Sequence, residues 1–356
     1  MLRIRFADLM LIVFTIAVLP TLVLAQISQP AMKQVVKEIP LPADTLVNFH
    51  SLHVATAADK AVYSSMEVPT DLSAKSAVTA SLLDMKTGKV TLLSDAVKDM
   101  PKQLVMPGDV APDGKSILLR DPSALCLLDL VTLKVTMLSA RLNIMSCWVG
   151  KRVAISGQGE DDGIDLVKLV APTGKSSDLP VRGFAMCASA NGDFIVVAAN
   201  AKVPTAKAEP ETMQTTASML IIDPAGKVLR ELTSMDVVSS KPMLSPNGKY
   251  VTFQTKPAGA GDGQDSKYGV TVLSTDGKES WTVKDEAGEP CAVLDDGSVV
   301  CSDLIHGLDG TEFRLVNKKG DKIVLGKGAD IAVVSGNVYL ATRGSKPVIR
   351  ISPLPR

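Results

Sequence analysis

SPNGKYVTFQT, residues 245–255, joins an Asn-Gly turn to a run of strand-forming residues. Asn-Gly or Asp-Gly between β-prone residues signals a hairpin, because glycine accepts the positive φ of a tight turn. Copies of the stretch recur about every 44 residues along the chain. They are APDGKSILLRD (111–121), SANGDFIVVAAN (189–200) and the weaker VGKRVAISGQG (149–159), LDDGSVVCSD (294–303) and SGNVYLATRG (335–344). A degenerate seventh copy, AADKAVYSSME, places Asp59 where the others have glycine.

A second hairpin follows the first in each repeat. Its turns are KTGK (86–89), VTLK (131–134), PTGK (172–175), PAGK (224–227), TDGK (275–278) and KKGD (318–321). Each repeat is therefore expected to form four short antiparallel strands, here called a, b, c and d. One such sheet cannot bury its own faces, whereas sheets arranged radially cover one another. The sequence predicts an all-β fold, a β-propeller of about seven four-stranded blades, with six as the alternative if the first copy is excluded.

The last repeat has room for strands a, b and c only. Segment 31–39, AMKQVVKEI, is strand-like and precedes the first repeat. We expect it to pair with residues 347–352 as the missing strand d, which would close the ring and remove its open edges.

The phrases APDGK and SPNGKYVTF, each followed by a strand and then by LDL…K or DPAGK, resemble the WD40-like "PD40" repeat. That repeat occurs in the propeller of the periplasmic translocation protein TolB and in many exported bacterial proteins. The resemblance covers most of residues 46–356 and is clearest over 111–138 and 245–283. It implies a propeller, export and a protein-binding role. It implies no catalytic residues, because the motif is structural.

The N-terminus has the pattern of an export signal. Arg3 and Arg5 precede an uncharged apolar run from Leu9 to Ala25. Val23 and Ala25 are small residues at positions −3 and −1 of a cleavage site before Gln26. We expect a signal peptide at 1–25, an N-terminal segment with the closing strand at 26–45 and the propeller at 46–356. The protein would be secreted or periplasmic. The alternative is that the apolar segment is not cleaved and anchors the protein, and we expect no other contact with a membrane.

Composition excludes one class of partner. The 38 Lys and Arg residues balance the 38 Asp and Glu residues, so no excess of cations offsets nucleic-acid phosphate. The chain has five cysteines, an odd number, none in a CxxC pair. One disulfide candidate remains, Cys291 with Cys301, because a three-residue turn at 295–297 would place them opposite each other across a hairpin.

Few residues suggest a chemical site, and no cofactor is expected. The densest acidic cluster, Glu160, Asp161, Asp162 and Asp165, could supply carboxylates to a cation but lacks EF-hand spacing, so a solvated loop is expected. His50 and His53 lie three apart in the expected first inner strand, VNFHSLHVA (47–55), which would send them to opposite faces. No GxSxG elbow and no phosphate-binding glycine loop is present.

The lengths of the connections point to one functional face. The a–b and c–d turns are short, whereas the long connections, 66–80, 200–217 and 256–267, all join strands b and c and so share one face of the ring. Function on a rigid scaffold is usually carried by such loops. We expect a non-enzymatic scaffold that binds another cell-envelope or extracellular protein or peptide on this face. The alternative is a hydrolase or lyase at the mouth of the central channel, although the expected inner strands (103–110, 143–149, 183–189, 237–244 and 331–335) contain few catalytic residue types.

Overall fold

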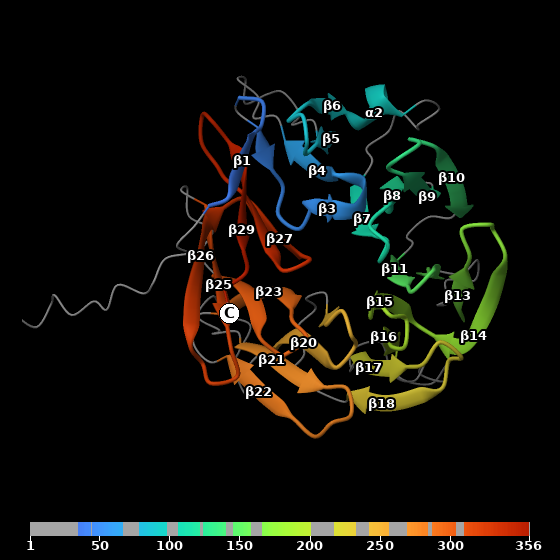
Figure 1. The fold of residues 1–356 in the computed structure, drawn as a ribbon. Helices are drawn as coiled ribbons and strands as arrows, with labels where there is room; N and C mark the ends of the chain where they lie inside the picture. Colours follow the sequence, from blue (N-terminus) through green and yellow to red (C-terminus); the bar gives the residue numbers. More distant parts are fainter. Residues whose placement is uncertain are drawn as a thin grey trace, which may run out of the picture.

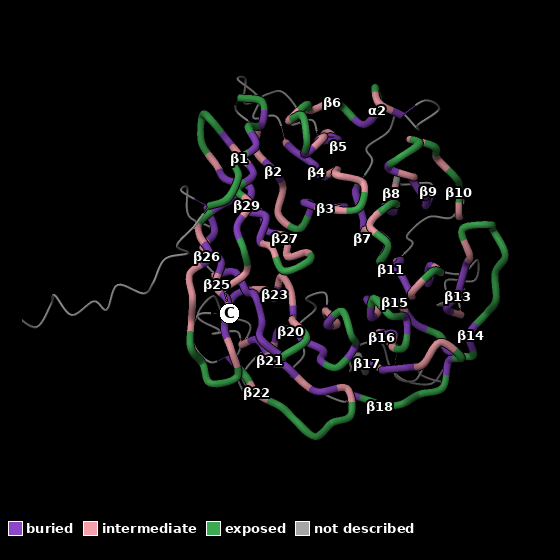
Figure 2. Tube along the Cα trace, viewed as in Figure 1, coloured by how far each residue is buried: buried purple, intermediate pink, exposed green. Residues whose placement is uncertain are grey.

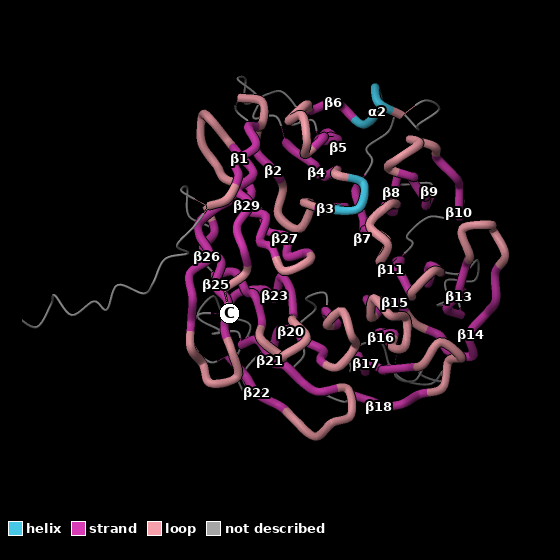
Figure 3. The backbone as a smooth tube through the Cα atoms, viewed as in Figure 1, coloured by secondary structure: helices cyan, strands magenta, loops and turns pink. Residues whose placement is uncertain are grey.

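The computed structural model describes twelve stretches of the chain. They are residues 35–43, 45–66, 78–97, 106–121, 124–139, 145–157, 166–200, 217–232, 242–255, 269–283, 287–303 and 310–355. The described part contains seven antiparallel sheets arranged in a ring around a central axis (Figure 1). The prediction of a seven-bladed β-propeller is confirmed. Helical structure in these residues is limited to two short pieces, η1 (Thr56–Ala58) and α2 (Leu93–Ala96) (Figure 3).

The first four blades follow the chain in order, each running from the axis outward as strands a to d. Blade 1 is β3 (His53–Ala55), β4 (Lys60–Met66), β5 (Val78–Asp84) and β6 (Val90–Leu92), with β2 (Leu46–Val47) also paired to β4. Blade 2 is β7 (Met106–Val110), β8 (Ser116–Asp121), β9 (Ala124–Asp129) and β10 (Val135–Ser139). Blade 3 is β11 (Met145–Val149), β12 (Arg152–Ser156), β13 (Leu166–Val170) and β14 (Ser176–Arg182). Blade 4 is β15 (Phe184–Ala188), β16 (Ile195–Asn200), β17 (Ala217–Ile222) and β18 (Val228–Leu232).

The remaining three blades complete the ring. Blade 5 is β19 (Met243–Leu244), β20 (Tyr250–Thr255), β21 (Gly269–Ser274) and β22 (Ser280–Val283). Blade 6 is β23 (Ala287–Val293), β24 (Val299–Asp303), β25 (Thr311–Val316) and β26 (Lys322–Gly328). Blade 7 is β27 (Asp330–Val334), β28 (Asn337–Ala341) and β29 (Val348–Pro353), with β1 (Lys37–Pro40) as its outermost strand.

The ring is closed by the N-terminal strand, as predicted. β1 runs antiparallel to β29, with Lys37 opposite Ile351 and Ile39 opposite Ile349. The backbone N–H of Val36 extends the ladder by donating to the carbonyl of Ile351 at 2.9 Å. The first part of the predicted segment, residues 31–34, lies outside the described residues.

The turns between strands a and b explain why the repeat has its glycines. All six predicted turn glycines have φ between +57° and +86° (Gly114, Gly150, Gly192, Gly248, Gly297 and Gly336). In blade 1 the left-handed position is taken by Asp59, with φ of 52°. The degenerate first copy is therefore a true repeat, which decides for seven blades against six.

The core consists of apolar layers between neighbouring blades. Figure 2 shows that buried residues lie along the strands of the ring. Alternate residues of a strand point to opposite faces of its sheet, so the middle strands of each blade bury side chains on both sides. In β8, Ile117 packs in the layer with blade 1, whereas Leu118 packs in the layer with blade 3, and neither is exposed. The result is a rigid ring from which the connections on either face project.

None of the helices in the described stretches is long and apolar enough to cross a membrane.

Candidate functional site

A cavity of about 550 Å³ runs along the axis of the ring. Its walls come from the inner strands β3, β7, β19, β23 and β27. Most of the lining is apolar and includes Leu52, Pro107, Met243, Ile331 and Val333. Each inner strand begins on the face that carries the b–c and d–a connections, which is the predicted functional face. We call the end of the cavity at this face the mouth.

Polar side chains join this lining from several blades. They are His50 and His53 from blade 1, Asp109 and Arg120 from blade 2, and Glu289 from blade 6. Arg120 lies at the end of β8, opposite Met106 at the start of β7, and its Nε is buried. No described residue forms a hydrogen bond or ion pair that uses this Nε.

The expectation that His50 and His53 face opposite ways is wrong, because both line the cavity. The strand predicted over residues 47–55 is interrupted between β2 and β3. His50 lies in that interruption with φ of 58°, a left-handed conformation that breaks the alternation of side chains along a strand.

The interruption after β2 is held by a buried carboxylate of blade 7. Asp330 Oδ2 accepts the backbone N–H groups of Ser51 and Leu52, both at 2.7 Å, and Oδ1 accepts the N–H of Ile331 at 2.8 Å. Asp330 is only 1% exposed. Burial raises the pKa of Asp330, while the three N–H groups act in the opposite direction. Asp330 is thus an anchor for the backbone at the mouth.

The same interrupted segment reaches past blade 7 to blade 6. His50 Nε2 lies 2.8 Å from Glu289 Oε2, and the Phe49 and Phe313 rings stack with centroids 6.1 Å apart. Segment 48–52 therefore connects blade 1 to blades 6 and 7, in addition to the closure of the ring by β1.

The disulfide candidates Cys291 and Cys301 do not lie directly opposite each other. The register places Pro290, not Cys291, opposite Cys301, because a bulge displaces this part of β23. All five cysteines carry thiols rather than disulfide bonds. Burial raises the pKa of Cys291 well above its usual range and that of Cys301 to about 11. Both thiols are therefore protonated at neutral pH and are poor nucleophiles, although Cys291 lines the cavity.

Other predicted site residues lie where the structure gives no description. The acidic cluster Glu160, Asp161, Asp162 and Asp165 is outside the described residues, as are most residues of the long b–c connections. Within the described stretches, no group of three or more His, Cys, Asp or Glu side chains is arranged to hold a metal ion.

Three residues of the mouth were missed by the sequence analysis. Glu289 belongs to the inner strand of blade 6, β23, for which the sequence predicted no range, and Arg120 reaches the cavity from β8, the second strand of blade 2. Asp330 lies directly before the predicted strand at 331–335. Alignment of the starts of all seven inner strands would have brought Glu289 and Asp330 to attention.

Comparison with known proteins supports the fold and nothing more specific. No protein-family model and no curated protein sequence matches the chain. Among solved structures, the β-propeller domain of the Trilobed protease from Pyrococcus furiosus matches with a TM-score of 0.54 and 15% identity, over 89% of this chain and 97% of that chain. Oligogalacturonate lyase from Vibrio parahaemolyticus matches with a TM-score of 0.55 and 9% identity, over 91% and 98%.

TolB from Acinetobacter baumannii is also similar, with a TM-score of 0.46 and 19% identity. The match covers 68% of this chain but only 56% of that TolB chain. The seven sheets and the two matches with TM-scores above 0.5 confirm the β-propeller fold that the PD40 resemblance implied. These two similar structures are a domain of a protease and a lyase.

Proposed function

We propose that this protein is an exported, non-enzymatic β-propeller that binds another polypeptide on the face of its b–c connections, with the channel mouth at the centre of the contact. The observation that carries the proposal is the preformed cavity of about 550 Å³, whose apolar walls meet polar groups from blades 1, 2 and 6 at the mouth. Binding sites commonly combine apolar walls with a few oriented polar groups.

The state of the ionisable groups favours binding over catalysis. Glu289 is engaged by His50, Asp330 is engaged by three backbone N–H groups, and the Cys291 thiol is protonated at neutral pH. A general base or nucleophile must instead be available to a substrate with a pKa suited to its task. These groups stabilise the shape of the mouth and leave its apolar walls for recognition.

Export is supported by residues 1–25, which have the charge pattern and the small residues of a cleaved signal. Sequencing of the N-terminus of material recovered outside the cytoplasm tests this part of the proposal. We expect the mature chain to start at Gln26. Recovery of Met1 would show a retained anchor instead.

The binding face is tested by photo-crosslinking in the native host. A photoreactive amino acid replaces Met106, which lines the mouth and is 59% exposed, or Leu229, which lies on the outer strand β18 and is 44% exposed. We expect a discrete polypeptide adduct from position 106 and not from position 229. Equal adducts from both positions, or none from position 106, would contradict the proposal.

One observation favours the alternative, a hydrolase or lyase at the mouth. Two histidines, an arginine and a glutamate line a single cavity, and these residue types perform acid–base chemistry. The purified protein can be incubated with oligogalacturonate and with peptide substrates. Turnover that His50→Gln abolishes would favour the enzyme, whereas we expect no turnover with either substrate class.

A further inference from the structure

A second, larger cavity lies away from the channel, at the seam between blades 2 and 3. Its volume is about 740 Å³, and it opens on the face of the tight a–b and c–d turns. We call it the 2–3 furrow. Its apolar lining includes Ala111, Pro112, Leu127, Trp148 and Pro172 from these two blades, and Ala190 from the turn of blade 4. Trp148 is fixed there because its Nε1 donates to the carbonyl of Asp109 at 2.9 Å.

The internal repeat shows what fills this space at other seams. Ser116, Phe194 and Tyr250 occupy equivalent positions, because each carbonyl accepts the N–H of the residue five places earlier in its a–b turn, at 2.7, 3.0 and 2.8 Å. The Phe194 ring lies against Gly248 in the turn of blade 5, and the Tyr250 ring lies against Gly297 in the turn of blade 6. An aromatic ring therefore occupies seams 4–5 and 5–6.

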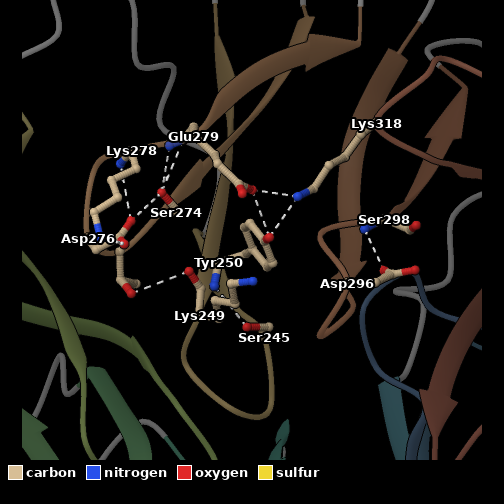
Figure 4. Close-up of polar contacts among 11 residues, drawn as sticks. Ser245, Lys249, Tyr250, Ser274, Asp276, Lys278, Glu279, Asp296, Ser298 and Lys318 are labelled. Carbon is tan, nitrogen blue, oxygen red and sulfur yellow. Dashed lines mark hydrogen bonds and ion pairs between the residues drawn. The ribbon is translucent and has the colours of Figure 1, made fainter.

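At seam 5–6 the ring is also part of a polar cluster (Figure 4). The Tyr250 hydroxyl donates to Glu279 Oε2 at 2.8 Å and accepts from Lys318 Nζ at 2.7 Å. Lys318 Nζ also lies 4.6 Å from the centroid of the Tyr250 ring. This cluster joins the two blades at the face of the tight turns.

The three positions of that cluster have different residues at seam 2–3. Ser116 replaces Tyr250 in the a–b turn. Lys134 replaces Glu279, because the backbone carbonyl of each accepts the hydrogen bond that closes its c–d turn. Pro172 replaces Lys318, because each is the second residue of the c–d turn in the following blade. The furrow exists because a serine lies where two other blades have a ring, and its rim lacks the carboxylate that balances the lysine at seam 5–6.

The lining of the furrow includes two lysines as well as two carboxylates, Asp113 and Asp129. Lys134 and Lys151 line it and are exposed, and neither forms an ion pair with a described residue. The nearby carboxylates have other partners, because Asp129 Oδ1 accepts the N–H groups of Val131 and Thr132, and Asp113 Oδ1 accepts that of Lys115. An incoming carboxylate would therefore find two lysines available.

The furrow continues along the outer strand of blade 2. Thr136 lines it, and Leu138, two residues further on the same face of β10, lines an adjoining cavity of about 200 Å³ between the same two blades. β10 is also an edge strand, hydrogen-bonded to β9 only. A site extended along an open strand edge suits a polypeptide better than a compact small molecule.

We propose that the 2–3 furrow binds an extended segment of a partner polypeptide, inserting an aromatic side chain where Tyr250 lies at seam 5–6 and placing acidic residues beside Lys134 and Lys151. This site is separate from the channel mouth and does not depend on the function proposed for it.

Trp148 provides a local readout, because the chain has 2 tryptophans and Trp281→Phe leaves Trp148 alone. The probe is the peptide Gly-Asp-Glu-Phe-Glu-Asp-Gly, acetylated and amidated, titrated into the purified mature protein. We expect a saturable change in Trp148 emission, and none with a peptide that has alanine in place of phenylalanine. Ser116→Phe should fill the furrow and weaken binding at least about tenfold while leaving the melting temperature unchanged or higher.

The charge requirement has a matched control within the repeat. Lys134→Glu with Lys151→Glu should weaken binding at least about tenfold. Lys227→Glu with Lys249→Glu changes the equivalent turn positions at seam 4–5 and should leave binding unchanged. Absence of saturable binding at millimolar peptide, undiminished binding by Ser116→Phe, or equal loss in both lysine pairs would overturn the proposal. If Ser116→Phe fails to fold, the two exposed lysine pairs still decide the question.

Discussion

Asp330 Oδ2 accepts the backbone N–H of Ser51 at 2.7 Å, which connects the start of blade 7 to the start of blade 1 across 279 residues of sequence. It accepts the N–H of Leu52 at the same distance. Together with the pairing of β1 with β29, this contact joins the two ends of the propeller at its inner and outer edges.

The hydrogen bonds of Asp330 predict that removal of its carboxylate lowers the stability of the fold. Asp330→Ala leaves two buried N–H groups of the interrupted segment without an acceptor, which should lower the free energy of unfolding by about 3 kcal/mol. Urea denaturation measures the change. Asp193→Ala, at an exposed turn, is the control and should stay within about 0.5 kcal/mol of the wild type. Equal midpoints for the two variants would show that Asp330 does not hold the ring.

The closure by β1 predicts that the N-terminal segment matters for the whole ring. Deletion of residues 26–40 removes β1 and exposes the edge of β29, so the melting temperature should fall and association through that edge should increase. Differential scanning calorimetry and light scattering measure the two effects. Deletion of residues 203–213, in the connection between β16 and β17, should have little effect on either. Similar behaviour of the two deletions would contradict the closure.

Substitution of two turn glycines by alanine should destabilise the fold to different extents. Gly248 and Gly320 both have positive φ, 73° and 84°, so alanine at either position should cost about 1 kcal/mol in conformational energy. At Gly248 a Cβ would also lie 2.4 Å from Phe194 Cδ2, whereas at Gly320 it would meet nothing within 4 Å. Gly248→Ala should therefore destabilise by at least about 1 kcal/mol more than Gly320→Ala. Equal urea midpoints would mean that Phe194 is not packed against this turn.

The carboxylate at the c–d turn of blade 1 predicts that stability depends on pH in the acid range. Asp84 accepts a hydrogen bond from Lys60 and from the N–H of Thr87, and these interactions hold the pKa of its carboxyl well below the ordinary value of about 3.9. A lowered folded-state pKa contributes stability above the unfolded-state pKa, and this is lost as the pH falls through the folded-state pKa. The wild type should exceed Asp84→Asn in stability at pH 7 by more than at pH 2. A difference that does not narrow between these pH values would contradict the assignment.

The cysteines predict a simple thiol count. A thiol reagent should detect five thiols per chain under denaturing conditions, and should react slowly with the native protein because Cys291 and Cys301 have raised pKa values. A count of three under denaturing conditions would show a disulfide bond and would restore the pairing suggested by the sequence.

Much of the fold could be predicted because the repeat is encoded locally. Each a–b turn needs a residue with positive φ, so glycine, or Asp59 in its place, marks every blade. The closing strand followed from the same logic, because a blade without strand d needs one from elsewhere. Cys291 was expected to lie opposite Cys301 because a regular hairpin was assumed, but a bulge in β23 shifts the register.

The site was harder to predict because it depends on departures from the repeat. His50 has a left-handed conformation, and the next two residues are held by Asp330, which is far away in sequence. Both histidines therefore line one cavity, although strand alternation would have separated them. Similarly, the furrow depends on Ser116 being small where Phe194 and Tyr250 are large, a difference that becomes meaningful only when the blades are superimposed.

We propose that the channel mouth binds a polypeptide partner. Calorimetric titration of the partner captured through position 106 into the wild type, Met243→Arg and Leu229→Arg tests this proposal. Met243 lines the cavity, whereas Leu229 lies on β18, the outer strand of blade 4, and is 44% exposed. We predict that Met243→Arg weakens binding at least about tenfold and that Leu229→Arg does not. Unchanged affinity for Met243→Arg, or a loss confined to Leu229→Arg, would contradict it.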